Sequence, residues 1–418
     1  MEKKDILVSI WCLTYNHELY IRDAIEGFLA QNVNFEYEII IHDDASTDNT
    51  AKVVEEYERK YPEVIHGIYQ KRNQYSKNYP STKWMIEMMI QNCKGKYIAM
   101  CEGDDYWIDV QKLQIQINYL ERHSECMMTI HNGVIINYEN DKIYSANLYT
   151  DDCMMPPKDI ITQKIIPLTA SMVYRREAKE MEEFFSNAGI GDYPNLLYCL
   201  TKGELYYFNR VMSVYRFRHS DSWTSNILQS KHSLIIHNVA MINFLEEFNR
   251  YTNREYEEYI VCRIQKSVTN ILAFCEDMGN KKFIEICKEC NKKTDKKYSI
   301  IFNQLKIMYL QVFNKEYLGK QTREFIKKNN RIVIMGIGKY AKIISDQFNF
   351  NNIRFEGYVV SNNQHTVERF LDRNVWKIKD IPKSTGIIIG INPIIWDEII
   401  LSLEEEKLCN YICPFLLK

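Results

Sequence analysis

Glycine and proline are scarce in this chain of 418 residues, with 15 and 9 copies. This scarcity argues against long disordered linkers, which are usually rich in such residues. No charge of one sign dominates, because 53 lysines and arginines nearly balance 55 aspartates and glutamates, for a net charge of −2. The composition therefore gives no indication of nucleic acid as a partner. With this length and 46% hydrophobic residues, we expect two or three folded domains.

Long hydrophobic runs are also missing. No window holds about 18 consecutive apolar residues, so we expect no transmembrane helix. Residues 1–5 are charged and precede an apolar run only as long as a strand, so we expect no signal peptide and a cytoplasmic location. The 12 cysteines are then expected to be reduced and mostly buried. Cys287 and Cys290 have a metal-type spacing, but no second pair follows, and we interpret them as two thiols on one helix face.

Two adjacent carboxylates, Asp104 and Asp105, follow the apolar residues 96–100, which are typical of a short buried strand. Gly103 lets the backbone turn tightly just before them. Adjacent like charges are unfavourable unless they share a cation. The simplest such cation is Mg²⁺ or Mn²⁺, which takes carboxylates together with the phosphates of a ligand. A solvated acidic turn is the alternative that this motif alone leaves open.

Strands and helices alternate through the first hundred residues. The expected strands are residues 6–13, 36–42, 63–70 and 96–100, and the expected helices are residues 18–31, 50–60 and 82–91. Polar clusters follow three of the strands, at residues 14–17, 43–48 and 104–105. Because ligands of a parallel sheet bind at the carboxyl ends of its strands, we expect these clusters to converge. Ser46 or Asp48 can also cap the helix that follows.

Three blocks, Val8–Asn16, Ile41–Thr50 and Glu102–Trp107, resemble a family 2 glycosyltransferase in their order and spacing. The resemblance covers residues 1–225, about half of the chain. It implies a GT-A fold, a single α/β domain that binds a nucleotide sugar. In that family the first block packs against the base and ribose, and the second aspartate of the second block bonds the base.

By this match the donor-binding residues are Thr14, Tyr15, Asn16 and Asp44. The last block corresponds to the family's Asp-X-Asp motif, although it reads Gly-Asp-Asp here. The resemblance implies that Asp105 binds the divalent metal, Mn²⁺ or Mg²⁺, and that Asp104 lies near the ribose or the metal. For Asp44 we favour the ligand role over capping, because a helix start needs only one capping side chain.

The acceptor half is expected to begin with a helix at residues 111–123 and a strand at residues 125–138. Residues 141–164 are irregular and polar, and we expect a loop near the acceptor. A strand at residues 167–175, a helix at residues 177–187 and a helix at residues 195–202 are expected to follow.

Asp192 stands between a glycine-rich turn and a helix, which resembles the catalytic position of the family. By match, Asp192 is the general base that removes the proton of the acceptor hydroxyl as the sugar inverts. Gly191 stands where many members have an acidic residue, and a helix N-cap is the alternative role for Asp192. Further on, Arg216, Arg218 and His219 offer cationic or imidazole groups to a diphosphate or metal. The role of His219 as a metal ligand comes from some members only, and a surface histidine is the alternative.

Residues 226–330 lose the strand signals and show apolar residues at helical spacing, so we expect several packed helices. The lysines of residues 281–297 leave open a basic face toward a membrane surface, although a solvated helix face is the simpler interpretation.

Residues 331–341 predict a strand, a glycine turn and a helix, and they resemble the dinucleotide fingerprint at Gly336, Gly338 and Ala341. Further strands at residues 353–360 and 386–391 and a helix at residues 396–407 complete a small Rossmann-like domain. No acidic residue follows its second strand to hold a ribose, which favours a structural, docking or regulatory module over a dehydrogenase.

The sequence thus predicts an α/β chain with a GT-A domain at residues 1–225, a helical region at 226–328 and a Rossmann-like domain at 329–418. We expect a metal-dependent inverting hexosyltransferase that uses a UDP-sugar and a saccharide acceptor, in lipid-linked form or free, in cell-surface polysaccharide synthesis. Peripheral contact with the inner face of the membrane and oligomer formation stay open. The alternatives are a non-catalytic nucleotide-sugar binding protein and an NAD-linked oxidoreductase centred on Gly336 and Gly338.

Overall fold

The structure is a computed structural model that describes residues 5–146, 148–176, 182–217, 230–294, 296–314, 320–361, 368–390, 399, 403 and 406–412. Contacts divide the chain into two compact units. Unit 1 comprises Met1–Ser233 and Asn243–Ile260, and unit 2 comprises Leu234–Ile242 and Val261–Lys418. The expected division into three parts remains a prediction.

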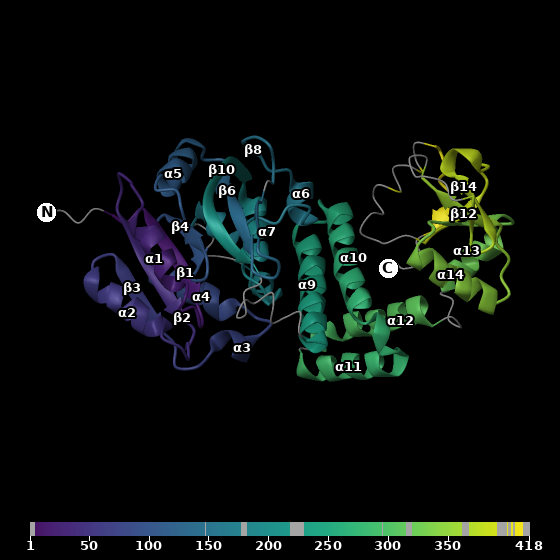
Figure 1. Ribbon diagram of the computed structural model, residues 1–418, viewed down its shortest axis with the longest axis horizontal. Helices are drawn as coiled ribbons and strands as arrows, with labels where there is room; N and C mark the ends of the chain where they lie inside the picture. Colours follow the sequence, from purple (N-terminus) through teal and green to yellow (C-terminus); the bar gives the residue numbers. More distant parts are fainter. Residues whose placement is uncertain are drawn as a thin grey trace. The chain divides into compact units, whose positions relative to one another are not determined.

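Unit 1 is built on one large mixed sheet (Figure 1). Its strands are β1 (Val8–Thr14), β2 (Tyr37–Asp43), β3 (Ile65–Tyr69), β4 (Tyr97–Glu102), β5 (Tyr106–Trp107), β6 (Cys126–Asn137), β7 (Lys142–Ser145), β8 (Cys153–Met154), β9 (Val173–Arg175) and β10 (Glu204–Phe217). Their order is β3-β2-β1-β4-β9-β6-β10-β5, with β7 beside β6 and β8 beside β10. β1 pairs in parallel with β2 and β4, and β6 pairs in parallel with β10. β9 is antiparallel to both β4 and β6, so it joins the two parallel parts of the sheet.

Helices alternate with the strands of unit 1, as the hydrophobic pattern predicts. They are α1 (Ile21–Leu29), α2 (Thr50–Lys60), α3 (Gln74–Asn78), α4 (Lys83–Asn92), α5 (Lys112–Arg122), α6 (Pro157–Ile161) and α7 (Asp192–Lys202), with 3-10 turns at Thr169–Ser171 and Glu183–Asn187. In α1 the buried residues Ile21, Ala24, Ile25 and Phe28 recur on one helical face. β1, β2 and β4 are buried over nearly their whole length, as strands covered on both faces should be. The α/β class with a parallel first half is confirmed.

Several elements of the acceptor half differ from the sequence prediction. Residues 141–164 were expected to form a loop, but they contain β7, β8 and α6. β7 and β8 are short, and they form because the edges of β6 and β10 offer them backbone partners. β10 extends over 14 residues, and shifts in its register with β6 break the simple alternation that would reveal it in the sequence.

Some boundaries also move. The strand expected at residues 167–175 is limited to β9, because a 3-10 turn occupies Thr169–Ser171. Of the helix expected at residues 177–187, the last five residues form a 3-10 turn, and residues 177–181 lie outside the described part. α7 begins at Asp192, three residues before the predicted start.

The predicted helical region is confirmed. It contains α9 (Lys231–Tyr251), α10 (Glu257–Phe274), α11 (Asn280–Lys293), α12 (Ser299–Phe313) and α13 (Lys320–Lys328), with 3-10 turns at Glu276–Met278 and Lys296–Tyr298. Cys287 and Cys290 are both buried on α11, in agreement with two thiols on one helix face. No helix in the described part of the chain combines the length and the apolar character that crossing a membrane requires.

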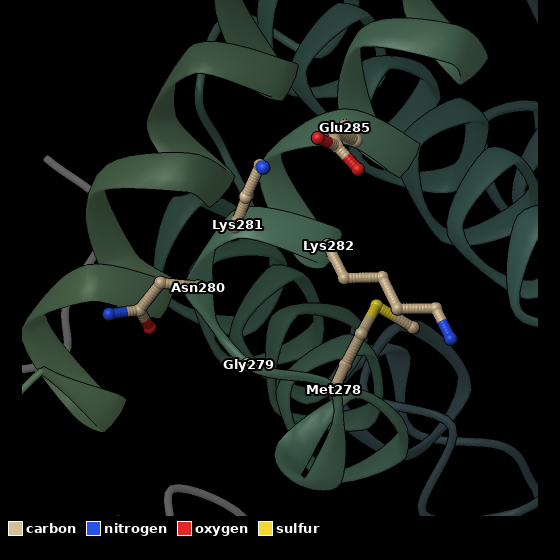
Figure 2. A pocket seen from close by; sticks show the side chains of 6 residues that line it. All are labelled: Met278, Gly279, Asn280, Lys281, Lys282 and Glu285. Atoms are coloured by element: carbon tan, nitrogen blue, oxygen red, sulfur yellow. The ribbon is translucent and has the colours of Figure 1, made fainter.

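A shallow hollow lies at the start of α11 in unit 2 (Figure 2). Its lining residues are Met278, Gly279, Asn280, Lys281, Lys282 and Glu285. Lys281 and Lys282 belong to the expected basic face and are exposed, but Glu285 offsets part of their charge. The membrane contact of this face stays a prediction.

The last part of unit 2 contains a small separate sheet. Its elements are β11 (Ile332–Met335), α14 (Lys339–Phe350), β12 (Gly357–Val360), β13 (Arg369–Phe370), β14 (Arg373–Lys377), a 3-10 turn at Ile378–Asp380, β15 (Gly386–Ile389) and β16 (Tyr411–Ile412). The order is β13-β14-β12-β11-β15-β16, and all neighbours pair in parallel except β13 with β14. The expected α/β arrangement is present, and the Rossmann-like assignment remains a prediction. The helix expected at residues 396–407 falls almost entirely outside the described residues.

Candidate active site

Three carboxylates meet in the acidic turn at the carboxyl end of β4. Ligand oxygens of Glu102, Asp104 and Asp105 lie within 4.8 Å of one another. Asp105 is 0% exposed and Asp104 is 9% exposed, whereas Glu102 is half-buried. A Cβ at Gly103 would stand 2.7 Å from Thr14 Oγ1, so only glycine lets this turn approach the end of β1 so closely.

Burial and, after it, the charges of neighbouring carboxyl groups raise the pKa values of Asp105 and Glu102. Burial is the largest cause for Asp105, followed by the charges of Asp104 and Glu102, and its pKa lies well above the usual range. Burial, Asp104 and Asp192 raise the pKa of Glu102 to about 8. Carboxyl groups packed this closely ionise together only when a cation offsets their repulsion.

The donor set fits a hard divalent cation. Asp105 Oδ1 accepts a hydrogen bond from the backbone N–H of Arg216 at 2.9 Å. Its other oxygen, Oδ2, is buried and has no hydrogen-bond partner among the described residues. Buried carboxylate oxygens rarely remain unpaired, and Mg²⁺ and Mn²⁺ prefer oxygen ligands of this kind. In the part of the chain that the structure describes, this is the one group of acidic, histidine or cysteine side chains with metal-binding spacing.

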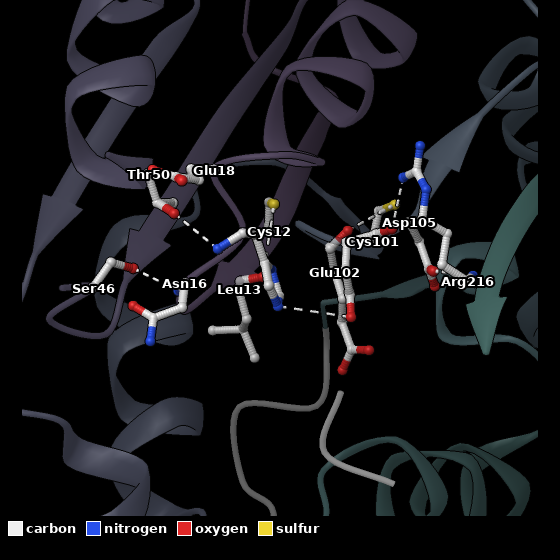
Figure 3. A network of polar contacts seen from close by, with 12 residues as sticks. Cys12, Leu13, Asn16, Glu18, Ser46, Thr50, Cys101, Glu102, Asp105 and Arg216 are labelled. Atoms are coloured by element: carbon white, nitrogen blue, oxygen red, sulfur yellow. Dashed lines mark hydrogen bonds and ion pairs between the residues drawn. The ribbon is translucent and has the colours of Figure 1, made fainter. Parts of the chain in front are cut away.

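The end of β10 packs against the acidic turn through Arg216 (Figure 3). Its guanidinium donates to the carbonyl oxygen of Asp104 at 2.7 Å and to Asp23 Oδ2 at 2.5 Å. The same group lies over the rings of Tyr106 and Tyr20, at 4.3 and 5.0 Å from their centroids. Arg216 is buried, and these contacts hold the acidic turn in place.

The polar clusters after β1 and β2 interlock. The backbone N–H of Asn16 donates to Ser46 Oγ at 2.9 Å, and the N–H of His17 donates to Thr50 Oγ1 at 2.8 Å (Figure 3). In return, Asn16 Oδ1 accepts from the N–H of Thr47 at 2.8 Å. His17 Nε2 lies 3.7 Å from Asp104 Oδ2, which links this pair of clusters to the acidic turn. The three clusters therefore converge at one edge of the sheet, as their positions after the strands predict.

The expected donor residues line this edge in different ways. Thr14 is buried, Tyr15 is 39% exposed, and Asn16 adopts a positive φ of 56°. Asp44 is buried, and its Oδ1 and Oδ2 accept hydrogen bonds from the N–H groups of Gln74 and Tyr75 at 2.7 and 2.9 Å. Asp44 thus bonds the first N–H groups of α3, whereas the sequence analysis weighed capping only at the helix that directly follows β2.

Of the two residues considered for capping α2, Asp48 bonds the first N–H group of the helix, whereas Ser46 has another role. Ser46 donates to Asp43 and holds the turn that follows β2. Asp48 Oδ1 accepts from the N–H and the Oγ1 of Thr50 at 2.9 and 2.6 Å, where α2 begins.

Asp192 is the first residue of α7, and the N-cap position belongs to Gly191. The simple N-cap interpretation of Asp192 is therefore wrong. Its Oδ1 accepts from the adjacent N–H of Tyr193 at 2.8 Å, and burial raises its pKa above the usual value. The charge of Asp192 is also one cause, after burial and Asp104, of the raised pKa of Glu102. Arg218 and His219 fall outside the described residues.

Sequence reasoning missed part of this site. Glu102 belongs to a block that was recognised, yet it was not singled out as a ligand. His17 follows the recognised residues of the first block, and Asp23 lies on α1 with no motif around it. Glu102 could have been recognised from its position close to Asp104 and Asp105. The role of Asp23 depends on its contact with Arg216, which no local sequence pattern indicates.

Comparisons with known proteins agree with this arrangement. Residues 9–178 match the model of the family described as glycosyl transferase family 2. An uncharacterized protein of Mycobacterium tuberculosis is 33% identical over 221 residues, which are 52% of this chain and 61% of that protein. WfaP of Escherichia coli, by its name a UDP-Glc:alpha-D-GlcNAc-diphosphoundecaprenol beta-1,3-glucosyltransferase, is 29% identical over 152 residues, or 36% of this chain and 53% of WfaP.

Solved structures resemble the chain more distantly. S. aureus TarS in complex with UDP-GlcNAc covers 73% of this chain and 92% of its own, with 14% identity and a TM-score of 0.41. The chain spans 61% of the length of the mycobacterial relative, which is less than two thirds. Over residues 9–178, unit 1 is thus similar to the glycosyl transferase family 2 domain.

Proposed function

We propose that this chain is a metal-dependent inverting glycosyltransferase that moves a sugar from a UDP-sugar to a hydroxyl of a saccharide acceptor. The observation that carries the proposal is the group of Glu102, Asp104 and Asp105 at the carboxyl end of β4, whose ligand oxygens lie within 4.8 Å of one another. An acidic cluster that can hold a cation, together with the raised pKa of the half-buried Asp192 at the start of α7, suits a reaction in which a diphosphate leaves and a hydroxyl loses a proton.

The acidic turn would hold Mn²⁺ or Mg²⁺. Asp105 was the ligand implied by the family resemblance, and the unpaired Oδ2 of Asp105 supports that role. Asp104 and Glu102 are the more accessible members of the cluster, so we assign them to the same ion. When bound, the ion supplies positive charge to the departing diphosphate. His219 remains a proposed additional ligand.

The donor nucleotide would lie over the interlocked clusters after β1 and β2. Tyr15 is exposed enough to pack against a base, and Thr14 and Asn16 stand beside it. Both oxygens of Asp44 already accept one hydrogen bond each. A carboxylate oxygen has a second lone pair, so Asp44 can also accept the N–H of a uracil base. The name of WfaP includes UDP-Glc, which supports a UDP-sugar as donor.

Asp192 would act as the general base. The acceptor hydroxyl oxygen forms a bond to the anomeric carbon while the bond from that carbon to the diphosphate oxygen breaks. The hydroxyl proton passes to the carboxylate of Asp192 as this bond forms. Burial raises the pKa of Asp192, so its carboxylate holds the proton more firmly than a solvated aspartate does.

The acceptor is proposed to be a saccharide of a cell-surface polysaccharide, linked to a lipid. The name of WfaP includes a diphosphoundecaprenol acceptor, and TuaG of Bacillus subtilis, 31% identical over 118 residues, is named for teichuronic acid biosynthesis. A lipid-linked acceptor would bring the chain to the inner face of the membrane as a peripheral protein.

Nucleotide release from a panel of sugar nucleotides tests the proposal. UDP-glucose, UDP-N-acetylglucosamine, UDP-galactose and GDP-mannose are incubated with the full chain and Mn²⁺, Mg²⁺ or EDTA. The expected result is release from a UDP-sugar that requires metal and is lost in Asp104→Asn and Asp105→Ala. Asp141→Asn is the control, because Asp141 is exposed in a turn with a φ of 55°, which asparagine also adopts readily. Absence of both turnover and calorimetric binding of UDP with Mn²⁺ would contradict the donor site.

A further inference from the structure

The proposed function places Asp44 at the donor nucleotide and Asp192 at the acceptor hydroxyl. One short segment contacts the surroundings of both residues. That segment is residues 73–82, which contain α3 and end at Thr82, immediately before α4, and which we name the strap. No motif in the sequence marks it, and the proposed function assigns it no role. Its hydrogen bonds show what it joins.

The first end of the strap is fixed by Asp44. The two carboxylate oxygens of Asp44 accept from the consecutive N–H groups of Gln74 and Tyr75 at 2.7 and 2.9 Å. Asn73 Oδ1 accepts from the N–H of Ser76 at 2.7 Å. These bonds satisfy the first N–H groups of α3, which a helix leaves without internal partners. The start of the strap is therefore fastened to the donor side of the site.

The other end of the strap is fastened to the segment before Asp192. The hydroxyl of Tyr75 donates to the carbonyl oxygen of Gly189 at 2.9 Å. The N–H of Thr82 donates to the carbonyl oxygen of Ser186 at 2.7 Å, and its Oγ1 lies 3.2 Å from the same oxygen. Both acceptors are backbone groups of residues 186–191, which connect a 3-10 turn to α7.

Packing reinforces these bonds next to Asp192. A Cβ placed on Gly191 would stand 2.4 Å from the terminal methyl of Met85, on α4. Because Gly191 has no side chain, Met85 of α4 can pack against the backbone immediately before Asp192. Gly191, which stands where many family members have an acidic residue, therefore has a packing role here.

We propose that Tyr75 is a positioning residue, and that the strap holds residues 186–191 so that Asp192 keeps its place while a donor is bound against Asp44. The proposal deepens the proposed function and rests on it for the roles of Asp44 and Asp192. The structural part of the proposal, that Tyr75 restrains residues 187–192, depends only on the hydrogen bonds described above. We assign Tyr75 to positioning because its hydroxyl donates to the backbone carbonyl of Gly189.

Amide hydrogen exchange of Tyr75→Phe tests the restraint in the full chain. This variant keeps the ring and the Asp44 bond to the Tyr75 N–H, and it removes only the hydroxyl. Tyr69→Phe is the matched control, since it removes a hydroxyl that donates to Glu58 at 2.9 Å, away from residues 186–191. We expect exchange at residues 187–192 to rise about tenfold in Tyr75→Phe, the size of one net hydrogen bond, and to stay unchanged in Tyr69→Phe. Equal exchange in all three proteins overturns the proposal.

A kinetic measurement separates positioning from simple stability. In Tyr75→Phe we expect the kcat for transfer to fall about tenfold, while the KM for the UDP-sugar stays within about twofold. Unchanged kcat in Tyr75→Phe, despite faster exchange, overturns the catalytic consequence. If the unmodified chain transfers no sugar at all, the proposed function fails, and the exchange experiment still decides whether Tyr75 restrains this segment.

Discussion

The backbone N–H of Arg216 donates to Oδ1 of Asp105 at 2.9 Å, a contact between residues 111 positions apart. Through this bond the end of β10 orients one of the three carboxylates of the acidic turn. The Arg216 side chain continues the contact to the carbonyl oxygen of Asp104 and to Asp23. The candidate metal site is thus assembled from β4, β10 and α1.

Arg216→Met is expected to lower the free energy of unfolding by about 2 to 3 kcal/mol. The substitution removes the only cation that bonds both Asp23 and the Asp104 carbonyl among the described residues, and it leaves the carbonyl oxygen of the buried Asp104 without this donor. Urea denaturation measures the change. Arg22→Met is the control, since Arg22 and Glu56 form an exposed ion pair at 3.3 Å whose loss should cost less than about 0.5 kcal/mol. Equal decreases in the free energy of unfolding in both variants would show that Arg216 stabilises the chain no more than an exposed ion pair does.

Without metal, the stability of the chain should fall as pH rises from about 4.3 to 8. In this window the unfolded chain has lost the proton of Glu102, while the folded chain keeps it, because the folded pKa is raised to about 8. The unfolded state then binds fewer protons, so the free energy of unfolding decreases by up to about 1.4 kcal/mol per pH unit for this group. Urea denaturation in EDTA at several pH values measures the slope, and Glu102→Gln should flatten it.

Added Mn²⁺ should reverse the fall in stability that rising pH causes without metal. A divalent ion binds the deprotonated carboxylates, so added Mn²⁺ should stabilise the chain more at about pH 7.5 than at about pH 5. The stabilisation should disappear in Asp105→Ala and persist in Asp141→Asn. Identical melting temperatures with Mn²⁺ and with EDTA at both pH values would count against a metal site in the acidic turn.

Asp192→Asn is expected to reduce kcat for sugar transfer by about 10² to 10⁴, the usual contribution of a general base. Asparagine keeps the shape of the side chain and can still accept the hydrogen bond from the N–H of Tyr193. Binding of UDP with Mn²⁺, measured by calorimetry, should therefore remain close to that of the unmodified chain. A variant that transfers sugar at the original rate would assign the base to another residue.

Lys112→Met is expected to stabilise the chain, and to do so most below about pH 7. Burial lowers the pKa of Lys112 to about 7, well below its unfolded value, so the folded state gives up a proton that the unfolded state keeps until about pH 10.4. The cost of burying the charge is full below the folded pKa and fades as pH rises toward the unfolded pKa. The bond from Lys112 Nζ to Gln116 Oε1 at 2.9 Å and its position 4.0 Å from the centre of the Trp107 ring offset part of that cost.

The measurement for Lys112 is the difference in unfolding free energy between the two proteins at about pH 6.5 and about pH 9. The difference should shrink at the higher pH. A difference that does not change with pH would mean that Lys112 keeps an ordinary pKa in the folded chain.

Much of the first unit could be read from local patterns. The helix predicted at residues 50–60 coincides with α2, and the strands predicted near residues 6–13 and 36–42 are β1 and β2 within two residues. These elements carry strong periodicity or continuous apolar runs, and both faces of their strands are covered. β10 was not predicted because its register shifts against β6 and its exposed residues interrupt the alternation of apolar and polar residues.

The candidate site was predictable only where its residues are neighbours in sequence. Asp104 and Asp105 stand together, and a polar cluster after a parallel strand points to the ligand edge of a sheet. The capping of α3 by Asp44 was not predictable, because a carboxylate after β2 can bond any N–H that the fold brings to it. The same holds for the bond between Tyr75 and Gly189, which are 114 residues apart.

The sequence by itself determined the α/β class, the order of strands and helices in the first half, and the residue types available at the carboxyl edge of the sheet. These follow from periodicity and from residues that are adjacent along the chain. Only the tertiary structure decided that Glu102 joins the acidic turn, that Arg216 and Asp23 brace it, and that the strap ties Asp44 to the segment before Asp192. Such pairings depend on where β10, α1 and α3 pack, and packing is set by the whole core rather than by any local pattern.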